Sequence, residues 1–171
     1  TAITINESIQ QVWNNTYLCG ADIELAGGIN LVADYFPNTY YGELSAEEII
    51  ALDPDFIFQT IGVREYGDEL RGYYQELQAD ERFNGITAIK NGDVYIMPYG
   101  IAGWDDDYEI GICVVMLAKL MYPDLFADVD VWEIAQDFYS RFLGVEITEE
   151  DWLFMHQHDF DGAKTLDVYH D

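Results

Sequence analysis

Residues near the end of the sequence have the chemistry to bind a transition metal. His156, His158 and Asp159 stand close together, and imidazole nitrogens and carboxylate oxygens are common ligands of such ions. The two histidines are two residues apart, and this spacing does not place them on one face of a helix. A solvated tail is therefore the favoured interpretation, and a metal site formed by these three side chains is the weaker alternative.

Asp105, Asp106 and Asp107 form a second cluster of potential ligands. Acids that precede an apolar helix are typical of residues that complement the positive end of the helix dipole, and we favour that role over cation binding. Two of these acids would also match the carboxylate pair of a glycosidase, but such pairs are unavoidable in a chain with 33 acidic residues. The sequence has no Gly-x-Ser-x-Gly elbow, phosphate-binding loop or dinucleotide-binding motif. We therefore predict a binding module and not an enzyme.

Three further residues are placed to line a ligand-binding cleft. In an open α/β sheet, ligands bind at the carboxyl ends of the strands. Tyr99 and Trp104 follow a predicted strand at 94–97, and Arg64 follows another at 56–60. The two aromatic side chains would contact the flat face of a ligand. Arg64 would pair either with an anionic ligand or with a neighbouring acid, and the sequence does not decide between these roles.

The elements that would position these residues alternate between strands and helices. Strands are predicted at 2–5, 56–60 and 94–97, and helices at 21–25, 45–52, 67–79, 108–122, 131–143 and 148–155. Trp13 and Tyr41 are assigned to loops, and Ser45 and Glu48 form a capping box that starts a helix. The alternation predicts an α/β fold of three layers, in which helices flank a mainly parallel sheet.

The composition narrows the classes of partner. The chain has 171 residues and a net charge of −26, yet half of its residues are apolar, which favours a folded domain. A surface this acidic repels nucleic acids and anionic lipids, and no segment is apolar for long enough to insert into a membrane. The acidity is interpreted as a general surface adaptation, with attraction of a cationic ligand as the alternative. Cys19 and Cys113 are expected to be two buried thiols, although one disulfide is the other option.

Five sequence motifs follow one another in a characteristic order. They are AGGIN at 26–30, YGELSAE at 41–47, DPDFI at 53–57, AIKNGDVY at 88–95 and LAKLMYPDLF at 117–126. The series resembles the C-terminal lobe of the substrate-binding proteins of ABC importers for iron–siderophore, haem and cobalamin complexes, the class III periplasmic binding proteins. The resemblance implies that residues 1–145 form a Rossmann-like lobe of a two-lobed protein, with a helix and an acidic, histidine-containing tail at 146–171.

The same resemblance implies partners and a location. The ligand would be a metal chelate held between this lobe and an N-terminal lobe that would precede Thr1, with no covalently bound cofactor. The complex would deliver an iron chelate, haem or corrinoid to an ABC permease. The protein would be extracytoplasmic, in the periplasm or at the cell surface, and anchored to the membrane in its full-length form. The resemblance does not identify the ligand.

Three residues take roles from the resemblance. Tyr41 matches an aromatic that lines the ligand cleft, with packing at the sheet end as the alternative. Glu47 matches a glutamate that docks onto arginines of the permease, with an ordinary first-turn acid as the alternative. Trp104 falls near a cleft tryptophan of the cobalamin binders, but the arginine that follows in those proteins is not evident here.

A second function remains open at this level. The chain could be a free-standing acidic surface domain that binds calcium, a transition metal or a protein partner. The number of acidic residues favours it, and the ordered motifs favour the receptor lobe.

Overall fold

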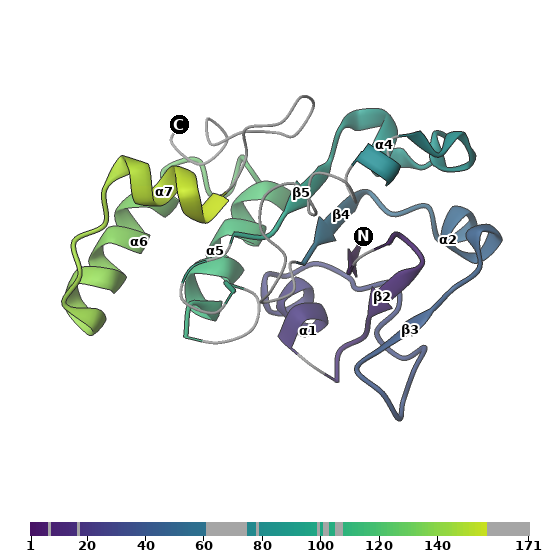
Figure 1. Cartoon of the computed structure of the whole chain (residues 1–171), viewed down its shortest axis with the longest axis horizontal. Helices are drawn as coiled ribbons and strands as arrows, with labels where there is room; N and C mark the ends of the chain where they lie inside the picture. Colours follow the sequence, from purple (N-terminus) through teal and green to yellow (C-terminus); the bar gives the residue numbers. More distant parts are fainter. Residues whose placement is uncertain are drawn as a thin grey trace.

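A computed structural model describes residues 1–6, 8–16, 18–60, 75–77, 79–98, 100, 103–104 and 108–156. Within this part of the chain the sheet has five strands in the order β3-β2-β1-β4-β5 (Figure 1). Their bounds are β1 (Ala2–Ile5), β2 (Gln11–Trp13), β3 (Tyr41–Glu43), β4 (Phe56–Gln59) and β5 (Val94–Ile96). Strands β1, β4 and β5 are parallel, and β2 is antiparallel to both of its neighbours. Strand β3 therefore runs in the same direction as β1, and the predicted mainly parallel α/β sheet is confirmed.

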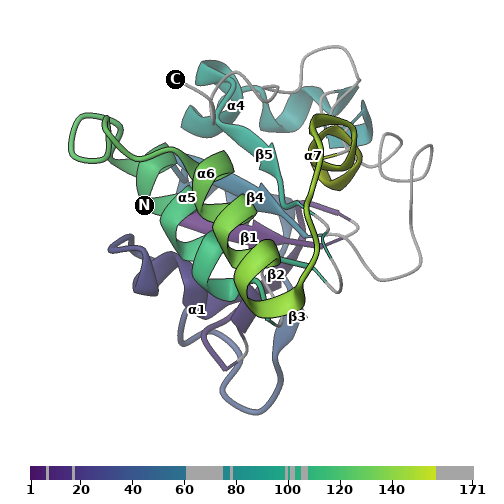
Figure 2. The same ribbon diagram turned by 90° about the vertical axis from the view of Figure 1, so that its left-hand side faces the viewer.

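Helices lie on both faces of the sheet, because each face is apolar and needs a cover. The helices are α1 (Leu18–Leu25), α2 (Ala46–Leu52), the 3₁₀ turn η1 (Glu81–Phe83), α4 (Thr87–Asn91), α5 (Ile110–Met121), α6 (Val131–Phe138), the π-helical turn η2 (Tyr139–Leu143) and α7 (Glu149–His156). One buried cluster joins β4 and β5 to α1, α5, α6 and α7, and a second joins the opposite face to α2, η1 and α4. Figure 2 shows α5 and α6 in front of the sheet. Helices α6 and α7 lie beyond α5, at the opposite end of the molecule from β2 and β3 (Figure 1).

The elements with strong local signals form as predicted. Strand β1 has the predicted bounds, and β4 is buried along most of its length. In α2 the Ser45 hydroxyl accepts from the Glu48 backbone N–H at 3.2 Å, while the Glu48 carboxylate accepts from the Ser45 N–H at 2.8 Å. Thr148 and Asp151 form the same reciprocal pair at the start of α7. These boxes satisfy backbone donors that the first helical turn leaves without partners.

Two strands were not expected. Trp13 lies in β2 and Tyr41 begins β3, so the prediction that both belong to loops is wrong. Each strand has three residues, and the two are separated by residues 14–40, which include α1. A pair assembled over that distance lacks the tight-turn signal of a local hairpin.

Other predictions fall on particular side chains. Cys19 and Cys113 are buried and are not joined in a disulfide, as expected. The predicted helix at 67–79 is described only at residues 75–77 and 79, which are helical. The helix predicted at 131–143 continues through η2, where its last turn widens. None of the helices in the described ranges has the length and apolar character that crossing a membrane requires.

Candidate ligand-binding site

A pair of aromatic rings, one exposed and one half-buried, lies at the β3 edge of the sheet. Trp13 and Tyr41 are directly opposite each other on β2 and β3. Their ring centroids are 5.4 Å apart, and the ring planes are tilted by 54°. Tyr41 keeps 48% of its surface exposed, and Trp13 is half-buried. Because opposite residues of neighbouring strands share a face, the two rings form one aromatic surface.

A polar pair adjoins these rings on the same face. Gln11 is directly opposite Glu43, and each lies two positions along its strand from an aromatic residue. Residues two positions apart point to the same side of a sheet. Gln11 is half-buried and Glu43 is exposed. We refer to Gln11, Trp13, Tyr41 and Glu43 as the β2–β3 patch.

The polar end of the patch reaches the carboxyl ends of the parallel strands. Asn6 follows β1, and its Nδ2 lies 3.5 Å from Oε1 of Gln11 as a hydrogen-bond donor. Gln59 ends β4 and donates from Nε2 to the Asn6 carbonyl at 3.3 Å. A row of amide side chains therefore connects the end of β4 to the patch. Ligands of open α/β sheets bind at these carboxyl ends of the strands.

Asn30 fixes the backbone beneath the patch. Its side chain is buried, and Nδ2 donates to the carbonyl of Trp13 at 3.2 Å and to that of Gly20 at 3.1 Å. Its Oδ1 accepts from the backbone N–H of Val32 at 3.1 Å. Asn30 is the last residue of the AGGIN motif, so the motif asparagine ties α1 and the following loop to β2.

Asn14 holds the other side of the aromatic pair. Its backbone N–H donates to the Tyr40 carbonyl at 3.0 Å, and its buried Nδ2 donates to the carbonyls of Phe36 and Thr39. The close approach of α1 depends on Gly20, where a Cβ would lie 2.1 Å from the Asn14 carbonyl oxygen. The segment that leads into Tyr41 is thus fixed by the main chain, and a pre-positioned aromatic surface loses little entropy when a ligand binds.

Glu47 lies on a different part of the surface. It is exposed in the first turn of α2, and the neighbouring Glu48 is engaged by the capping box. The pKa of Arg82 is raised above its usual value, chiefly by its hydrogen bond to Asp80 and to a smaller extent by the charge of Glu47. Glu47 is therefore an exposed carboxylate near a guanidinium group.

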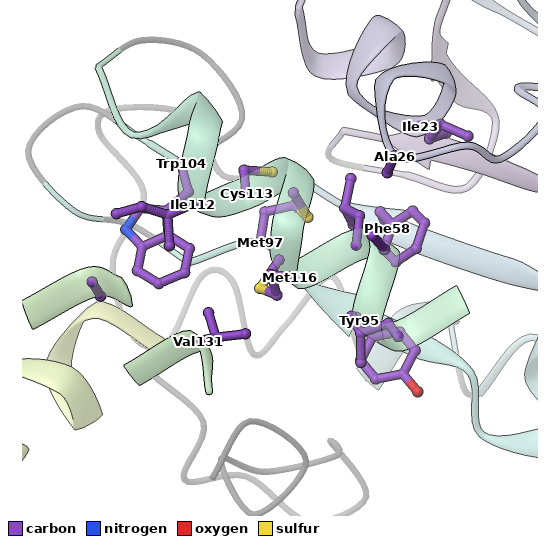
Figure 3. Packing of buried hydrophobic residues seen from close by; sticks show 14 of the residues in the cluster. Ile23, Ala26, Phe58, Tyr95, Met97, Trp104, Ile112, Cys113, Met116 and Val131 are labelled. Carbon is purple, nitrogen blue, oxygen red and sulfur yellow. The ribbon is translucent and has the colours of Figure 1, made fainter. Parts of the chain in front are cut away.

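Trp104 is not on a surface. Its side chain is 0% exposed, and Figure 3 shows it beside Ile112 in the core. Its ring lies 5.5 Å from that of Trp152 and 5.2 Å from that of His156, both on α7. A ring covered in this way offers no contact to a ligand, so the structure does not support the prediction that Trp104 lines the cleft.

A buried polar pair lies near Trp104. The Tyr139 hydroxyl donates to Oε1 of Glu109 at 2.6 Å, and both side chains are buried. Burial raises the pKa of Tyr139 above its usual value of 10.0, and the hydrogen bond and the charge of Glu109 raise it further. This pair belongs to the packing around α5 and α6 and not to an open site.

His156 is also part of the core. It ends α7, is 0% exposed, and has Nδ1 2.8 Å from the Trp152 carbonyl oxygen. The prediction of a solvated tail is therefore wrong at His156, because α7 extends through it. His158 and Asp159 lie outside the described residues, and the part that is described contains no group of three or more potential metal ligands.

Several predicted site residues cannot be placed against the patch. Arg64, Tyr99 and the aspartates at 105–107 lie outside the described residues. Of the aromatic residues predicted to line a cleft, Tyr41 is the one whose exposed surface the structure describes. Trp13, Gln11 and Glu43 were missed, although the alternation in Gln11-Val12-Trp13 and in Tyr41-Gly42-Glu43 is typical of short strands.

Comparison with known proteins supports the resemblance found in the sequence. The family described as "Periplasmic binding protein" matches residues 15–99, a segment that contains Tyr41, Glu47 and the AGGIN motif. The resemblance to the periplasmic binding proteins is therefore confirmed over that segment. Proteins of this family are binding components of transport systems and not enzymes, in agreement with the predicted binding module.

The chain is similar to several members of known structure or function. It is 26% identical over 125 residues to the molybdate-binding protein MolA of Haemophilus influenzae, covering 72% of this chain and 33% of MolA. A periplasmic solute binding protein from Veillonella parvula has a TM-score of 0.74 and 24% identity, covering 91% of this chain and 46% of that protein. Helicobacter pylori CeuE, solved with Ni(II) bound, has a TM-score of 0.71 and 19% identity, covering 90% of this chain and 47% of CeuE. The structural matches establish the lobe fold, and the chain spans between a third and half of the length of these relatives.

Proposed function

We propose that the chain is one lobe of an extracytoplasmic substrate-binding protein of an ABC importer. In this proposal the β2–β3 patch is its half of the ligand site. The observation that carries the proposal is the Trp13–Tyr41 aromatic pair at the β3 edge of the sheet, held in place by the motif residue Asn30. The family match at residues 15–99 and the span of about half of the related structures support a lobe of a longer receptor.

The ligand that suits this surface is a metal chelate with an organic framework. Aromatic faces give apolar contact area and little loss of side-chain entropy, which fits an iron–siderophore, haem or corrinoid. One relative binds molybdate and another has been solved with Ni(II) bound, so proteins of this fold include some that bind metal-containing ligands. A second lobe would supply the opposite wall.

We also propose that Glu47 contacts an ABC permease. Its exposure in the first turn of α2 and its separation from the capping role of Glu48 support an outward-facing function. In the complete receptor, Glu47→Gln should weaken the stimulation of ATP hydrolysis that the receptor causes in the cognate permease and its ATPase, reconstituted in liposomes. Glu24→Gln, an exposed acid on α1, should leave it unchanged, and equal effects of the two variants would contradict this role.

The ligand proposal is tested by measuring affinity for three chelates by calorimetry: a ferric hydroxamate siderophore, haemin and cobalamin. Tyr41→Ala removes one ring of the pair and should weaken binding of the accepted chelate by about 2- to 10-fold, because such aromatic contacts contribute about 0.5–1.5 kcal/mol. The control is Phe154→Ala on α7, which removes an exposed ring far from the patch. No binding of any chelate, or equal loss in both variants, would contradict the proposal.

A further inference from the structure

We propose that Glu43 selects ligands by charge, so that the patch accepts a cationic or neutral chelate with hydrogen-bond donors and disfavours an anion. This inference rests on the proposed ligand-binding function of the patch. It concerns the class of ligand and assigns Glu43 a role in specificity that is separate from the aromatic contact.

The position of Glu43 allows it to reach a ligand that is stacked on Tyr41. The two side chains lie on one face of β3, two positions apart, a separation of about 6.6 Å along a strand. Both are exposed. A chelate that covers the tyrosine ring would therefore bring its rim, where ammonium or hydroxyl groups project, close to the Glu43 carboxylate.

The partner of Glu43 across the strands is neutral. Gln11 faces it, and the next side chain along this edge is the amide of Asn6, which donates to Gln11. These amides can give or accept hydrogen bonds but do not cancel a charge. Glu43 is thus the one charged member of the patch.

The Lys and Arg residues in the described part of the chain lie outside the patch. Arg82 pairs with Asp80 at 2.6 Å and Arg141 pairs with Asp137 at 2.7 Å. The other two described cations are Lys119, which donates to the Val129 carbonyl, and Lys90, which is exposed on α4. None of these residues belongs to β2, β3 or α1, so within these ranges nothing in the patch attracts an anion.

The expected preference is small but measurable. Exposed pairs of opposite charge contribute about 0.2–1 kcal/mol, which corresponds to about 1.4- to 5-fold in affinity. The attraction should decrease between 0.15 M and 1 M NaCl, because the Debye length falls from about 8 Å to about 3 Å. Aromatic contact has no such salt dependence.

A pair of probes that differ only in charge provides the test. Ferrioxamine B carries a terminal ammonium group, its N-acetylated derivative is neutral, and molybdate serves as the anion. The chain should bind ferrioxamine B severalfold more tightly than the acetylated form at 0.15 M NaCl, and molybdate most weakly. Glu43→Gln should bring the two hydroxamate affinities together.

Glu24→Gln is the matched control, because it removes one exposed acid from the end of α1, which leads to the amino end of β1 and not to the carboxyl ends of the strands. It should keep the preference, which separates a local effect of Glu43 from the net charge of −26. Equal hydroxamate affinities in the unmodified chain, equal effects of the two variants, or tighter binding of molybdate would overturn the inference.

Tyr41→Ala separates this failure from failure of the proposed function. If Tyr41→Ala weakens both hydroxamates while Glu43→Gln changes neither ratio, the ligand site stands and charge selection fails. If Tyr41→Ala has no effect, or if no probe binds, both proposals fail. Circular dichroism and thermal melting of each variant confirm that it is folded.

Discussion

The molecule has two clusters of aromatic side chains, and only one of them is open. Trp13 and Tyr41 lie on short strands at one edge of the sheet, and Tyr41 is about half exposed. Trp104 and Trp152 lie at the other end of the molecule, where α7 covers the first ring and both are buried. An aromatic residue near the end of a strand can therefore line a ligand site only if no later element covers it.

The clusters also differ in what holds them. The open pair is fixed mainly by hydrogen bonds from Asn14 and Asn30 to the backbone, which leave the rings available. The closed cluster is fixed by ring contacts among Trp104, Trp152 and His156, and these contacts cover the ring surfaces. Changes in the closed cluster should therefore lower stability more than ligand binding, and changes in the open pair should lower ligand binding more than stability.

The largest expected difference is in stability. Trp104→Ala should lower the free energy of unfolding by about 3–5 kcal/mol, because it leaves a cavity in the core. Tyr41→Ala should cost less than about 1 kcal/mol, since that ring is half in solvent. Urea unfolding followed by circular dichroism measures both values. Similar losses would mean that the two clusters do not differ as described.

A smaller effect is expected from the support of the open pair. Asn30→Ala should cost about 1–3 kcal/mol, because the buried carbonyls of Trp13 and Gly20 lose their donor. Amide hydrogen exchange in β2 and β3 should become faster. Asn84→Ala, an exposed residue after η1, is the control and should change neither quantity. Unchanged exchange in Asn30→Ala would contradict its positioning role.

The smallest effect concerns pH and the closed end. The pKa of Tyr139 is raised on folding, so the unfolded chain releases this proton first as the pH rises above about 10. The contribution of Tyr139 to stability is therefore complete below pH 10 and is lost above it, by at most about 1.4 kcal/mol per pH unit. Tyr139→Phe should show a shallower fall in unfolding free energy between pH 10 and 11 than the unmodified chain. Identical slopes would exclude this contribution.

The sequence predicted the elements that depend on neighbouring residues. The capping box of Ser45 and Glu48 defines the start of α2. The helix is capped at its other end by Asp53, directly before Pro54, which cannot continue a helix. The apolar run at the start of β4 likewise identified a buried strand. In these cases the interactions that decide the structure span fewer than about ten residues.

The site was harder to predict, because its parts come together over long distances. Tyr41 was identified by resemblance. Its partner Trp13 lies on β2, which pairs with β3 although α1 separates the two strands in the sequence. Trp104 is buried by α7, which begins more than forty residues later at Glu149. No local pattern at Trp104 distinguishes a covered ring from an exposed one.

The most direct test of the ligand site uses the indole N–H signals of the four tryptophans in a two-dimensional NMR spectrum, assigned with single Trp→Phe variants. Titration with ferrioxamine B should shift or broaden the signal of Trp13, because its ring adjoins Tyr41 in the patch. The signals of Trp104 and Trp152 should stay in place, since α7 and the core separate them from ligand. A shift of Trp104 with an unchanged Trp13 would contradict a ligand site at the β2–β3 patch and would place the ligand at the other end of the molecule.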